Sequence, residues 1–334
     1  MIDHVYIIAE AGVNHNGKLD LALQLCKAAK EAGADAVKFQ TWKTENIVTK
    51  AAELASYQKN NISDKDKSQY QMLKELELSF SDFAQINAYC HKIGIQFLST
   101  ASEKESLEFI LSLGVPFIKL GSGDINNIPH LRMIGSYHKD VLLSTGMSYL
   151  SDVDLSYRTL IESGAKSVSL LHCTTNYPCP YDEVNLQAMQ TLKQAFKCNI
   201  GYSDHTMGIE IPIAAVAMGA KIIEKHLTLD RTMDGPDHKA SLEPLELKAM
   251  VNAIRNVEKG LGNGIKQPNA SEVKISQVVL KRIVAAKEIN AGDVFSTENL
   301  TYKRTSIGLS TRYWDIVCGS ISDKHYNIDD PITI

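Results

Sequence analysis

The stretch "IGYSDHTMGIEIPIAAVAMGAKIIEKHLT", residues 200–228, contains one complete strand–helix–strand unit. Its first apolar run ends in a polar segment with His205, and the helical pattern that follows closes at Gly219, a residue at which helices commonly end. A second apolar run begins at once and ends near His226. Two strands joined by one helix predict a parallel pair with a right-handed crossover, so both histidines would lie at the same edge of a sheet.

The same unit recurs along the whole first part of the chain. Short, nearly continuous apolar runs, typical of strands that are buried on both faces, alternate with helical patterns that often close with a glycine. Repetition of this unit predicts the α/β class and a (β/α)8 barrel, the TIM-barrel fold. The eight expected strands are residues 5–12, 36–41, 95–100, 117–123, 141–146, 168–174, 199–205 and 221–228.

The repeats end near Gly264, which predicts three parts in the chain. We expect a barrel domain over residues 1–265, a linker with a helical piece over 266–281, and a small β-rich domain over 282–334. So short a tail would lean on the barrel or on a second subunit, because it is too small for a large core of its own. A long polar insertion, residues 43–79, follows the second strand and predicts a loop with short helices over one face of the barrel.

Composition narrows the class of protein. A chain of 334 residues with 44% hydrophobic and 22% charged residues is typical of a globular protein. A net charge of −4 without a basic block argues against nucleic acid, and no apolar segment is long enough to span a membrane. Six scattered cysteines without a Cys-x-x-Cys pair predict reduced thiols and a cytoplasmic location.

Active sites of (β/α)8 barrels lie at the carboxyl ends of the strands, so the polar residues found there are candidates. Lys38 and Lys119 lie inside apolar strands, where a buried ammonium group requires an anion. Together with Ser122, Ser144 and Ser203, they would form a socket for a phosphate and a carboxylate. Either lysine alone could instead extend its amine into solvent.

Two histidines, His205 and His226, end neighbouring strands and could share a Zn²⁺- or Mn²⁺-like cation. Water and substrate oxygens would fill the other positions, and such an open site would polarise a carbonyl as a Lewis acid. The alternative is a pair of hydrogen-bonded core histidines. His15 could join the metal site, although its sequence "NHNG" is also typical of a plain turn.

Two carboxylates are candidates for acid–base chemistry. Glu10 ends an apolar run, and burial would raise its pKa toward that of a useful general base. It could instead form a salt bridge with one of the lysines. Asp237 lies in the tight loop "MDGPDHKAS" and could orient a substrate hydroxyl or cap a turn.

Several motifs, taken in order along the chain, resemble the sialic acid synthase family: "AEAGVNHNG", "KFQT", "KLGSGD", "LSTGMS", "HCTTNYP", "GYSDHTMGIEIPIAAVAMGA", "EKHLTLD" and "GPDHKASLEP". The resemblance covers nearly the whole chain, and its tail looks like the antifreeze-like (SAF) domain of that family. It implies an enzyme that condenses phosphoenolpyruvate with an N-acetylated mannosamine-type sugar. It also implies a divalent metal, Mn²⁺ or Mg²⁺, and a swapped homodimer in which each tail covers the partner's barrel.

The resemblance assigns roles to residues at the matching motif positions. Catalysis would fall to Glu10, His205 and His226, and the two histidines would hold the metal. Phosphoenolpyruvate would be bound by Lys38, Thr100, Lys119, Ser122, Ser144 and Ser203. The sugar or the attacking water would be faced by Gln40, Thr175, Tyr177 and Asp237, with Arg304 reaching the N-acetyl group from the other subunit.

The chain departs from the family pattern at four places. Ala101 follows Ser-Thr where the family often has proline, and Asp124 stands where glutamate is usual. Thr175 replaces an asparagine of some members, and Thr305 replaces the proline that follows Arg304. The last two changes concern the sugar end, so the identity of the sugar is the open question.

The motifs favour an N,N'-diacetyllegionaminate synthase, with 2,4-diacetamido-2,4,6-trideoxymannose as the acceptor. The alternative is an N-acetylneuraminate synthase that uses N-acetylmannosamine, and a pseudaminate synthase is favoured less. Another phosphoenolpyruvate-dependent synthase, making a 3-deoxy-ulosonic acid phosphate, would need a further basic cluster for the sugar phosphate. Retention of Glu10, both lysines and both histidines argues against a non-catalytic carbohydrate-binding protein.

Overall fold

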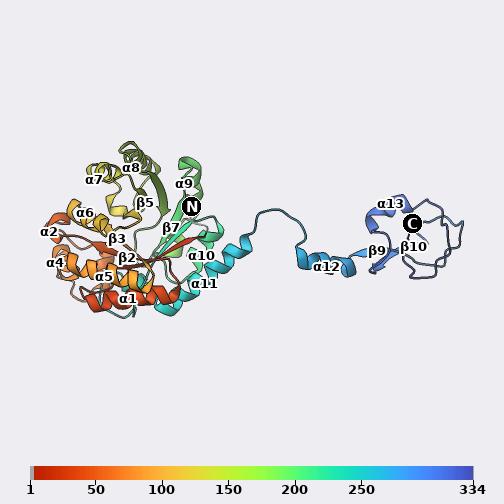
Figure 1. The fold of residues 1–334 in the computed structure, drawn as a ribbon, viewed down its shortest axis with the longest axis horizontal. Coiled ribbons are helices and arrows are strands. Elements are labelled where there is room, and N and C mark those ends of the chain that lie inside the picture. The colour runs from red at the N-terminus through yellow and green to blue at the C-terminus, as the bar shows by residue number, and fades with distance from the viewer. Residues whose placement is uncertain (1–3, 334) are drawn as a thin grey trace. The chain divides into compact units, whose positions relative to one another are not determined.

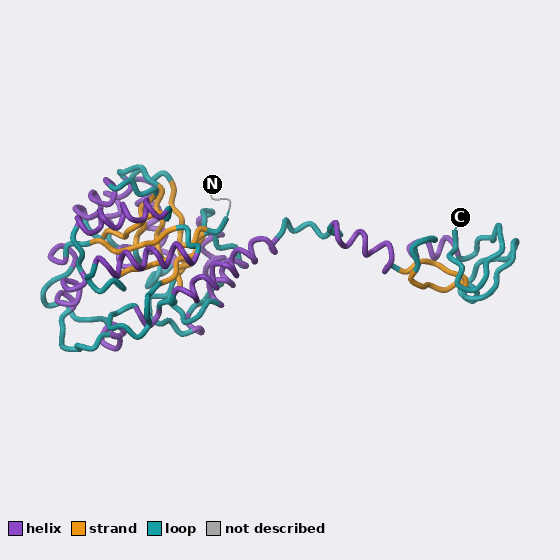
Figure 2. The backbone as a smooth tube through the Cα atoms, turned by 60° about the horizontal axis from the view of Figure 1, so that its bottom comes forward, coloured by secondary structure: helices purple, strands orange, loops and turns teal. Residues whose placement is uncertain are grey.

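The computed structural model describes residues 4–333. The chain divides into two compact units, with the boundary after Gly262. The first unit is a closed barrel surrounded by helices, and the second is a small, loop-rich unit with a two-stranded sheet (Figures 1 and 2). Each unit has its own hydrophobic core.

Eight parallel strands close the barrel, in sequence order around the ring, which confirms the predicted fold class. The strands form because each apolar run is buried both inside the barrel and beneath the helices. Glu10 pairs in register with Lys38 on one side and with His226 on the other. The strands are β1 (Tyr6–Gly12), β2 (Ala36–Thr41), β3 (Gln96–Ala101), β4 (Phe117–Leu120), β5 (Asp140–Ser144), β6 (Ser167–His172), β7 (Ile200–Asp204) and β8 (Ile222–His226).

A helix follows each strand and packs against the outside of the barrel (Figure 1). Gly33 ends the first of these helices in the left-handed conformation, at a φ of 87°, as the sequence pattern predicted. The eight helices are α1 (Leu19–Ala32), α5 (Phe80–Ile93), α6 (Lys104–Ser112), α7 (Ile128–Gly135), α8 (Leu150–Glu162), α9 (Ala188–Phe196), α10 (Glu210–Ala217) and α11 (Pro244–Leu261).

Alternation of side chains along each strand divides the barrel residues between two environments. On β1, Ile7 and Ala9 belong to the core shared with the helices, whereas Ile8 and Glu10 alternate with them toward the interior. A layer of apolar side chains fills the interior on the amino-terminal side of Glu10: Ile8, Ala36, Leu98, Leu142, Leu171 and Ile222. Polar side chains therefore concentrate above this layer, at the carboxyl ends of the strands.

The insertion after β2 contains three short helices, as predicted: α2 (Thr44–Ile47), α3 (Ser56–Asn61) and α4 (Gln69–Leu76). These helices surround a small apolar cluster of their own, separate from the main core. Its buried members are Val13, Trp42, Leu54, Ile62, Met72 and Leu76.

The second unit contains a helix, α12 (Ala270–Val279), within the stretch predicted as a linker. Its sheet pairs β9 (Lys281–Ala285) antiparallel with β10 (Leu300–Arg304), and a short helix, α13 (Trp314–Val317), follows. The buried core of this unit is Ile283, Ala285, Ile289, Phe295, Leu300, Val317, Tyr326 and Ile332. The predicted domain boundaries at residues 265 and 282 remain predictions. Between residues 4 and 333, no helix has the length and apolar character needed to cross a membrane.

Candidate active site

The strand ends of the barrel surround a cavity of about 380 Å³. Its lining contains every predicted site residue except Asp237 and Arg304. Those that line it are Glu10, Lys38, Gln40, Thr100, Lys119, Ser122, Ser144, Thr175, Tyr177, Ser203, His205 and His226. Residues from all eight strands or the loops after them therefore meet in one place, at the face where barrel enzymes hold their active sites.

Lys38 is buried at the end of β2 and has two partners in the cavity. Its Nζ lies 2.8 Å from Glu10 Oε2 and donates to Thr100 Oγ1 at 2.9 Å. Gln40 donates to the other oxygen of Glu10, at 3.1 Å. The salt bridge that the sequence left as an alternative for Glu10 is thus present, within the predicted site.

Lys119 is equally buried and has a different set of partners. Its Nζ donates to Ser144 Oγ at 2.8 Å and to the carbonyl of Leu120 at 3.1 Å. Lys119 and Ser144, which are both predicted to bind the anionic substrate, are therefore in contact with each other.

Glu224 on β8 joins the two lysines, and sequence analysis assigned it no role. Its carboxylate lies 3.4 Å from Lys119 and 3.8 Å from Lys38, and it accepts a hydrogen bond from Ser203 Oγ at 2.9 Å. The sequence signal was a charged residue inside an apolar strand, two positions before His226, so that both side chains face the same side.

The four buried charges determine the protonation of the site. Burial lowers the pKa of Lys38, but Glu10 and Glu224 outweigh it and hold this pKa above its ordinary value. Burial alone lowers the pKa of Lys119 more than Glu224 can restore. Burial also opposes ionisation of Glu224, yet both lysines together hold its pKa at about 2. For Glu10 burial prevails over Lys38, and its pKa is raised to about 6.

His205 and His226 lie side by side at the ends of β7 and β8, with ring centroids 5.4 Å apart. His205 Nδ1 lies 2.6 Å from the carbonyl of Thr174, which can only accept, so this nitrogen carries the proton and Nε2 keeps its lone pair. His226 Nδ1 is buried and has no hydrogen-bond partner among residues 4–333. His205 is thus buried and hydrogen-bonded, as the alternative of two core histidines expects, whereas His226 Nδ1 is unpaired among these residues.

Both imidazoles are neutral near neutral pH, which is the protonation state that binds a metal ion. Burial lowers the pKa of His205, and burial together with the neighbouring ring lowers the pKa of His226 far below its ordinary value. Neutral rings with available lone pairs are the form in which histidine binds a divalent cation. Within the described residues, no group of three or more His, Cys, Asp or Glu side chains is arranged to hold a metal ion.

Tyr177 covers the histidine pair. Its ring centroid lies 4.1 Å from that of His205 and 5.5 Å from that of His226. On its other side, the ring of Tyr57 from α3 lies 4.8 Å away. Burial raises the pKa of Tyr177, so its hydroxyl stays protonated and can donate to a ligand.

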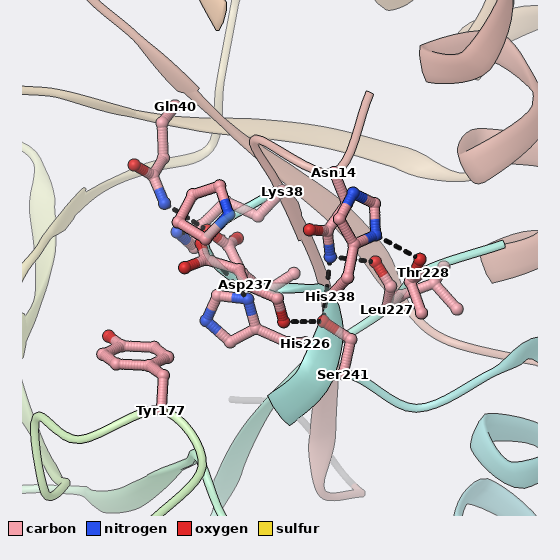
Figure 3. Close-up of polar contacts among 12 residues, drawn as sticks. Asn14, Lys38, Gln40, Tyr177, His226, Leu227, Thr228, Asp237, His238 and Ser241 are labelled. Atoms are coloured by element: carbon pink, nitrogen blue, oxygen red, sulfur yellow. Dashed lines mark hydrogen bonds and ion pairs between the residues drawn. The ribbon is translucent and has the colours of Figure 1, made fainter. Parts of the chain in front are cut away.

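Asp237 lies beside the histidines, with Oδ2 3.9 Å from His226 Nδ1 (Figure 3). Burial and the charge of Glu10 raise its pKa to about 7. Its loop is held from behind by a polar network: Ser241 donates to the carbonyl of Asp237, and Asn14 donates to Ser241 (Figure 3). Asp237 does not line the cavity itself, and its predicted role toward the sugar or the attacking water remains a prediction.

Gly146 is a second residue that sequence analysis did not single out. Its backbone N–H donates to Ser122 Oγ at 2.9 Å. A Cβ here would lie 2.3 Å from Thr175 Oγ1 and 2.8 Å from Ser122 Oγ, so only glycine allows this approach. Thr175 Oγ1 is buried without a hydrogen-bond partner among the described residues, and it faces the cavity as an unused polar group.

Two further candidates lie outside the cavity. His15 sits in a turn, where its Nδ1 accepts from the N–H of Gly17, and it does not line the cavity. Arg304 is exposed at the end of β10 in the second unit. Its predicted contact with a sugar in a partner's barrel remains a proposal.

This geometry defines a class of protein. Paired lysines with hydroxyl partners suit a small ligand that carries phosphate and carboxylate groups. Neutral imidazoles beside them suit a divalent cation, and a carboxyl group with a raised pKa suits proton transfer. A barrel with these groups at its carboxyl-end rim is a candidate enzyme for an anionic substrate.

Comparison with known proteins gives the family. Residues 25–266 match the model of the NeuB family. The chain is 47% identical to the N,N'-diacetyllegionaminic acid synthase of Campylobacter jejuni over 98% of both chains, and 45% identical to that of Legionella pneumophila over 94% of this chain and 89% of the relative. Among solved structures, the N-acetylneuraminic acid synthetase of Leptospira borgpetersenii matches at 36% identity with a TM-score of 0.71, covering 83% of this chain and 93% of that one. The chain belongs to the NeuB family, as the sequence motifs predicted.

Proposed function

We propose that the protein is an N,N'-diacetyllegionaminate synthase. It would condense phosphoenolpyruvate with 2,4-diacetamido-2,4,6-trideoxymannose and water, and release phosphate. The observation that carries this proposal is the 47% identity, over nearly the full length of both chains, with a protein of that name. The match to an N-acetylneuraminic acid synthetase is lower, at 36%.

Phosphoenolpyruvate would occupy the buried end of the cavity. Lys38 and Lys119 supply two ammonium groups, while Glu224 and Glu10 now neutralise them. An arriving anion would take over contacts with both lysines, and Thr100, Ser122, Ser144 and Ser203 could donate from their hydroxyl groups. The site thus keeps its buried charges paired before the substrate arrives.

His205 and His226 would hold Mn²⁺ or Mg²⁺, which would supply Lewis-acid polarisation of the acceptor's aldehyde. Thr174 fixes the tautomer of His205 so that Nε2 is available. Tyr177 packs against both rings and limits the approach of water from that side.

The residues of the chain account for the proton transfers. In the condensation, C3 of phosphoenolpyruvate forms a bond to the aldehyde carbon, whose oxygen gains a proton, and positive charge develops at C2. Water adds at C2, and Glu10 is placed to accept its proton, since a pKa of about 6 leaves it ionised near neutral pH. The C2 hydroxyl then loses its proton as the C–O bond to phosphate breaks, which restores the carbonyl at C2. In the net reaction one proton of the water ends on the former aldehyde oxygen and the other on the released phosphate.

Assembly and location complete the proposal. We infer a swapped homodimer, in which Arg304 of the SAF-like tail reaches the sugar's N-acetyl group in the partner's barrel. We also infer a cytoplasmic enzyme, in keeping with six free cysteines. The inference of a swapped homodimer rests on the family resemblance, and that of a cytoplasmic location rests on the cysteines.

An N-acetylneuraminate synthase is the second candidate, supported by the 36% identity with the Leptospira protein. Phosphate release separates the candidates: purified protein is supplied with phosphoenolpyruvate, Mn²⁺ and one acceptor at a time. We expect faster turnover with 2,4-diacetamido-2,4,6-trideoxymannose than with N-acetylmannosamine. A preference for N-acetylmannosamine would transfer the assignment to the second candidate, and turnover with neither would refute both.

A further inference from the structure

One wall of the otherwise polar cavity is apolar, and it comes from the insertion after β2. Ile47 and Val48, at the end of α2, and Leu73 of α4 line this wall, and Gln69 of α4 borders it. All three side chains are partly exposed, unlike the fully buried lysines at the cavity's other end. The motifs that predicted the site contain none of these residues.

The insertion is attached to the loops that carry the predicted sugar-binding residues. Asn61, at the end of α3, is buried and donates from Nδ2 to the carbonyls of Tyr177 and Pro236, at 3.1 and 2.7 Å. Tyr57 of the same helix stacks on Tyr177. These contacts connect the apolar wall to Tyr177 and to the residue that precedes Asp237, at the sugar end of the site.

The wall is supported from behind. Ile47 and Leu73 pack against the apolar cluster of the insertion. Thr44 fixes the start of α2, because its N–H and hydroxyl both donate to Glu77 Oε2, at 2.9 and 2.6 Å. A ligand would therefore meet a fixed apolar surface here.

Depth in the cavity decides which part of the sugar reaches this wall. The reacting aldehyde carbon, C1, must lie beside phosphoenolpyruvate and the histidines, where the side chains are 2–5% exposed. An extended open-chain sugar then directs its other end, C6, toward the partly exposed side of the cavity. Ile47, Val48 and Leu73 are among the partly exposed lining residues, as are the predicted sugar-binding residues Gln40 and Tyr177.

We propose that this wall determines acceptor specificity by contacting C6 of the sugar, and that it selects a methyl group there over a hydroxymethyl group. The proposal rests on the proposed function, because the trideoxy acceptor carries the methyl. A hydroxyl packed on Ile47, Val48 and Leu73 would lose water without gaining a partner from these three side chains. Discrimination by one such group is about 10- to 200-fold in kcat/KM.

The test compares two acceptors that differ only at C6: 2,4-diacetamido-2,4,6-trideoxymannose and its 6-hydroxy counterpart. Val48→Thr replaces one methyl of the wall by a hydroxyl of nearly equal volume, and Leu73→Gln adds an amide. Leu155→Gln, on the exposed surface of α8, is the matched control. The readout is the ratio of kcat/KM for the two acceptors, together with the KM for phosphoenolpyruvate.

We expect both wall variants to lower the 6-deoxy/6-hydroxy ratio about tenfold or more, with the KM for phosphoenolpyruvate unchanged and the control equal to wild type. An unchanged ratio in both wall variants, or an equal loss with both acceptors, would overturn the inference. Wild-type protein that turns over neither acceptor refutes the proposed function instead. In that case the 6-deoxy/6-hydroxy ratio of kcat/KM is measured with 6-deoxy-N-acetylmannosamine and N-acetylmannosamine. A lower ratio in both wall variants supports the inference, and an unchanged ratio overturns it.

Discussion

Single residues in this site are paired with each other where a substrate should bind. Lys38 contacts Glu10, and Lys119 contacts Glu224, so two ammonium groups remain compensated in a buried environment. An unpaired buried charge would cost several kcal/mol, roughly, per ion. On binding, the substrate anion would therefore replace Glu10 and Glu224 as the ionic partner of the two lysines.

Lys119→Met should raise the KM for phosphoenolpyruvate by at least about tenfold, because a hydrogen bond to a charged group contributes about 1.5–3 kcal/mol. The KM for the acceptor should change much less. Lys166→Met is the control, since Lys166 is exposed and, among residues 4–333, forms its ion pair with Asp140 on the surface. Steady-state kinetics with each substrate varied checks this, and an equal rise in both KM values would contradict the assignment of Lys119.

The pH dependence follows from Glu10. Burial raises its pKa to about 6, so the ionised base is present above this pH and is lost as pH falls through it. We expect kcat/KM to fall about tenfold per pH unit below pH 6, which reports the free enzyme. In Glu10→Gln the rate should fall by about 10²- to 10⁴-fold and this acid limb should disappear. A variant that keeps the limb would show that another group controls it, and Asp237, with a pKa raised to about 7, would then be tested as Asp237→Asn.

The sequence identifies candidate residues of the site better than it identifies the contacts between their side chains. Lys38, Lys119 and the histidines could be found because a charged or polar side chain at the end of an apolar strand is a strong signal in a barrel. Glu224 has the same signal, but its role as a partner of both lysines depends on distances across the barrel. No local sequence pattern marks Gly146, because what requires a glycine there is the close approach of Thr175 and Ser122 from the segments after other strands.

At the scale of elements, β7 and β8 are fixed to each other just outside the histidine pair. Lys225 and Asp204 alternate with His226 and His205 along the strands, and both are completely buried. Lys225 Nζ donates to Asp204 and to the carbonyl of Thr206. Asp204 also accepts from the hydroxyl of Tyr202 at 2.9 Å. This ion pair holds the ends of the strands that carry the histidines.

Lys225→Met should lower the free energy of unfolding by about 3–5 kcal/mol, because it leaves Asp204 buried without its cation. Lys225→Met combined with Asp204→Asn should recover part of that loss, since the amide carries no charge and can still accept from Tyr202. Chemical denaturation measures both variants. Equal destabilisation in the single and double variants would show that packing, not charge, explains the effect.

The barrel strands could be predicted because runs buried on both faces are long apolar signals. The insertion was harder, since its three helices are only four, six and eight residues long, too short for a repeated helical pattern. Its attachment to the loops after β6 and β8 includes the hydrogen bonds of Asn61, whose two acceptors lie 116 and 175 positions away in the chain. Contacts of that range are not visible in a local pattern.

At the scale of the whole molecule, the chain consists of a barrel and a small second unit that bears Arg304. If the tail serves the partner's barrel, two inactive variants should complement each other. Arg304→Ala retains a complete barrel, and Glu10→Gln retains a complete tail. A co-expressed equal mixture should recover about a quarter of wild-type activity, because half of the dimers are mixed and each of these has one complete site. Activity no higher than the mean of the two variants would contradict exchange of the tails.

The central claim is that His205 and His226 hold one divalent cation beside the lysine-bound substrate. Electron paramagnetic resonance of Mn²⁺, titrated into the metal-free protein with and without phosphoenolpyruvate, tests this claim independently of turnover. We predict one bound Mn²⁺ per chain, tighter binding with phosphoenolpyruvate, and loss of binding in His205→Gln and His226→Gln but not in the exposed control His91→Gln. Wild-type Mn²⁺ binding in both site variants would contradict the account.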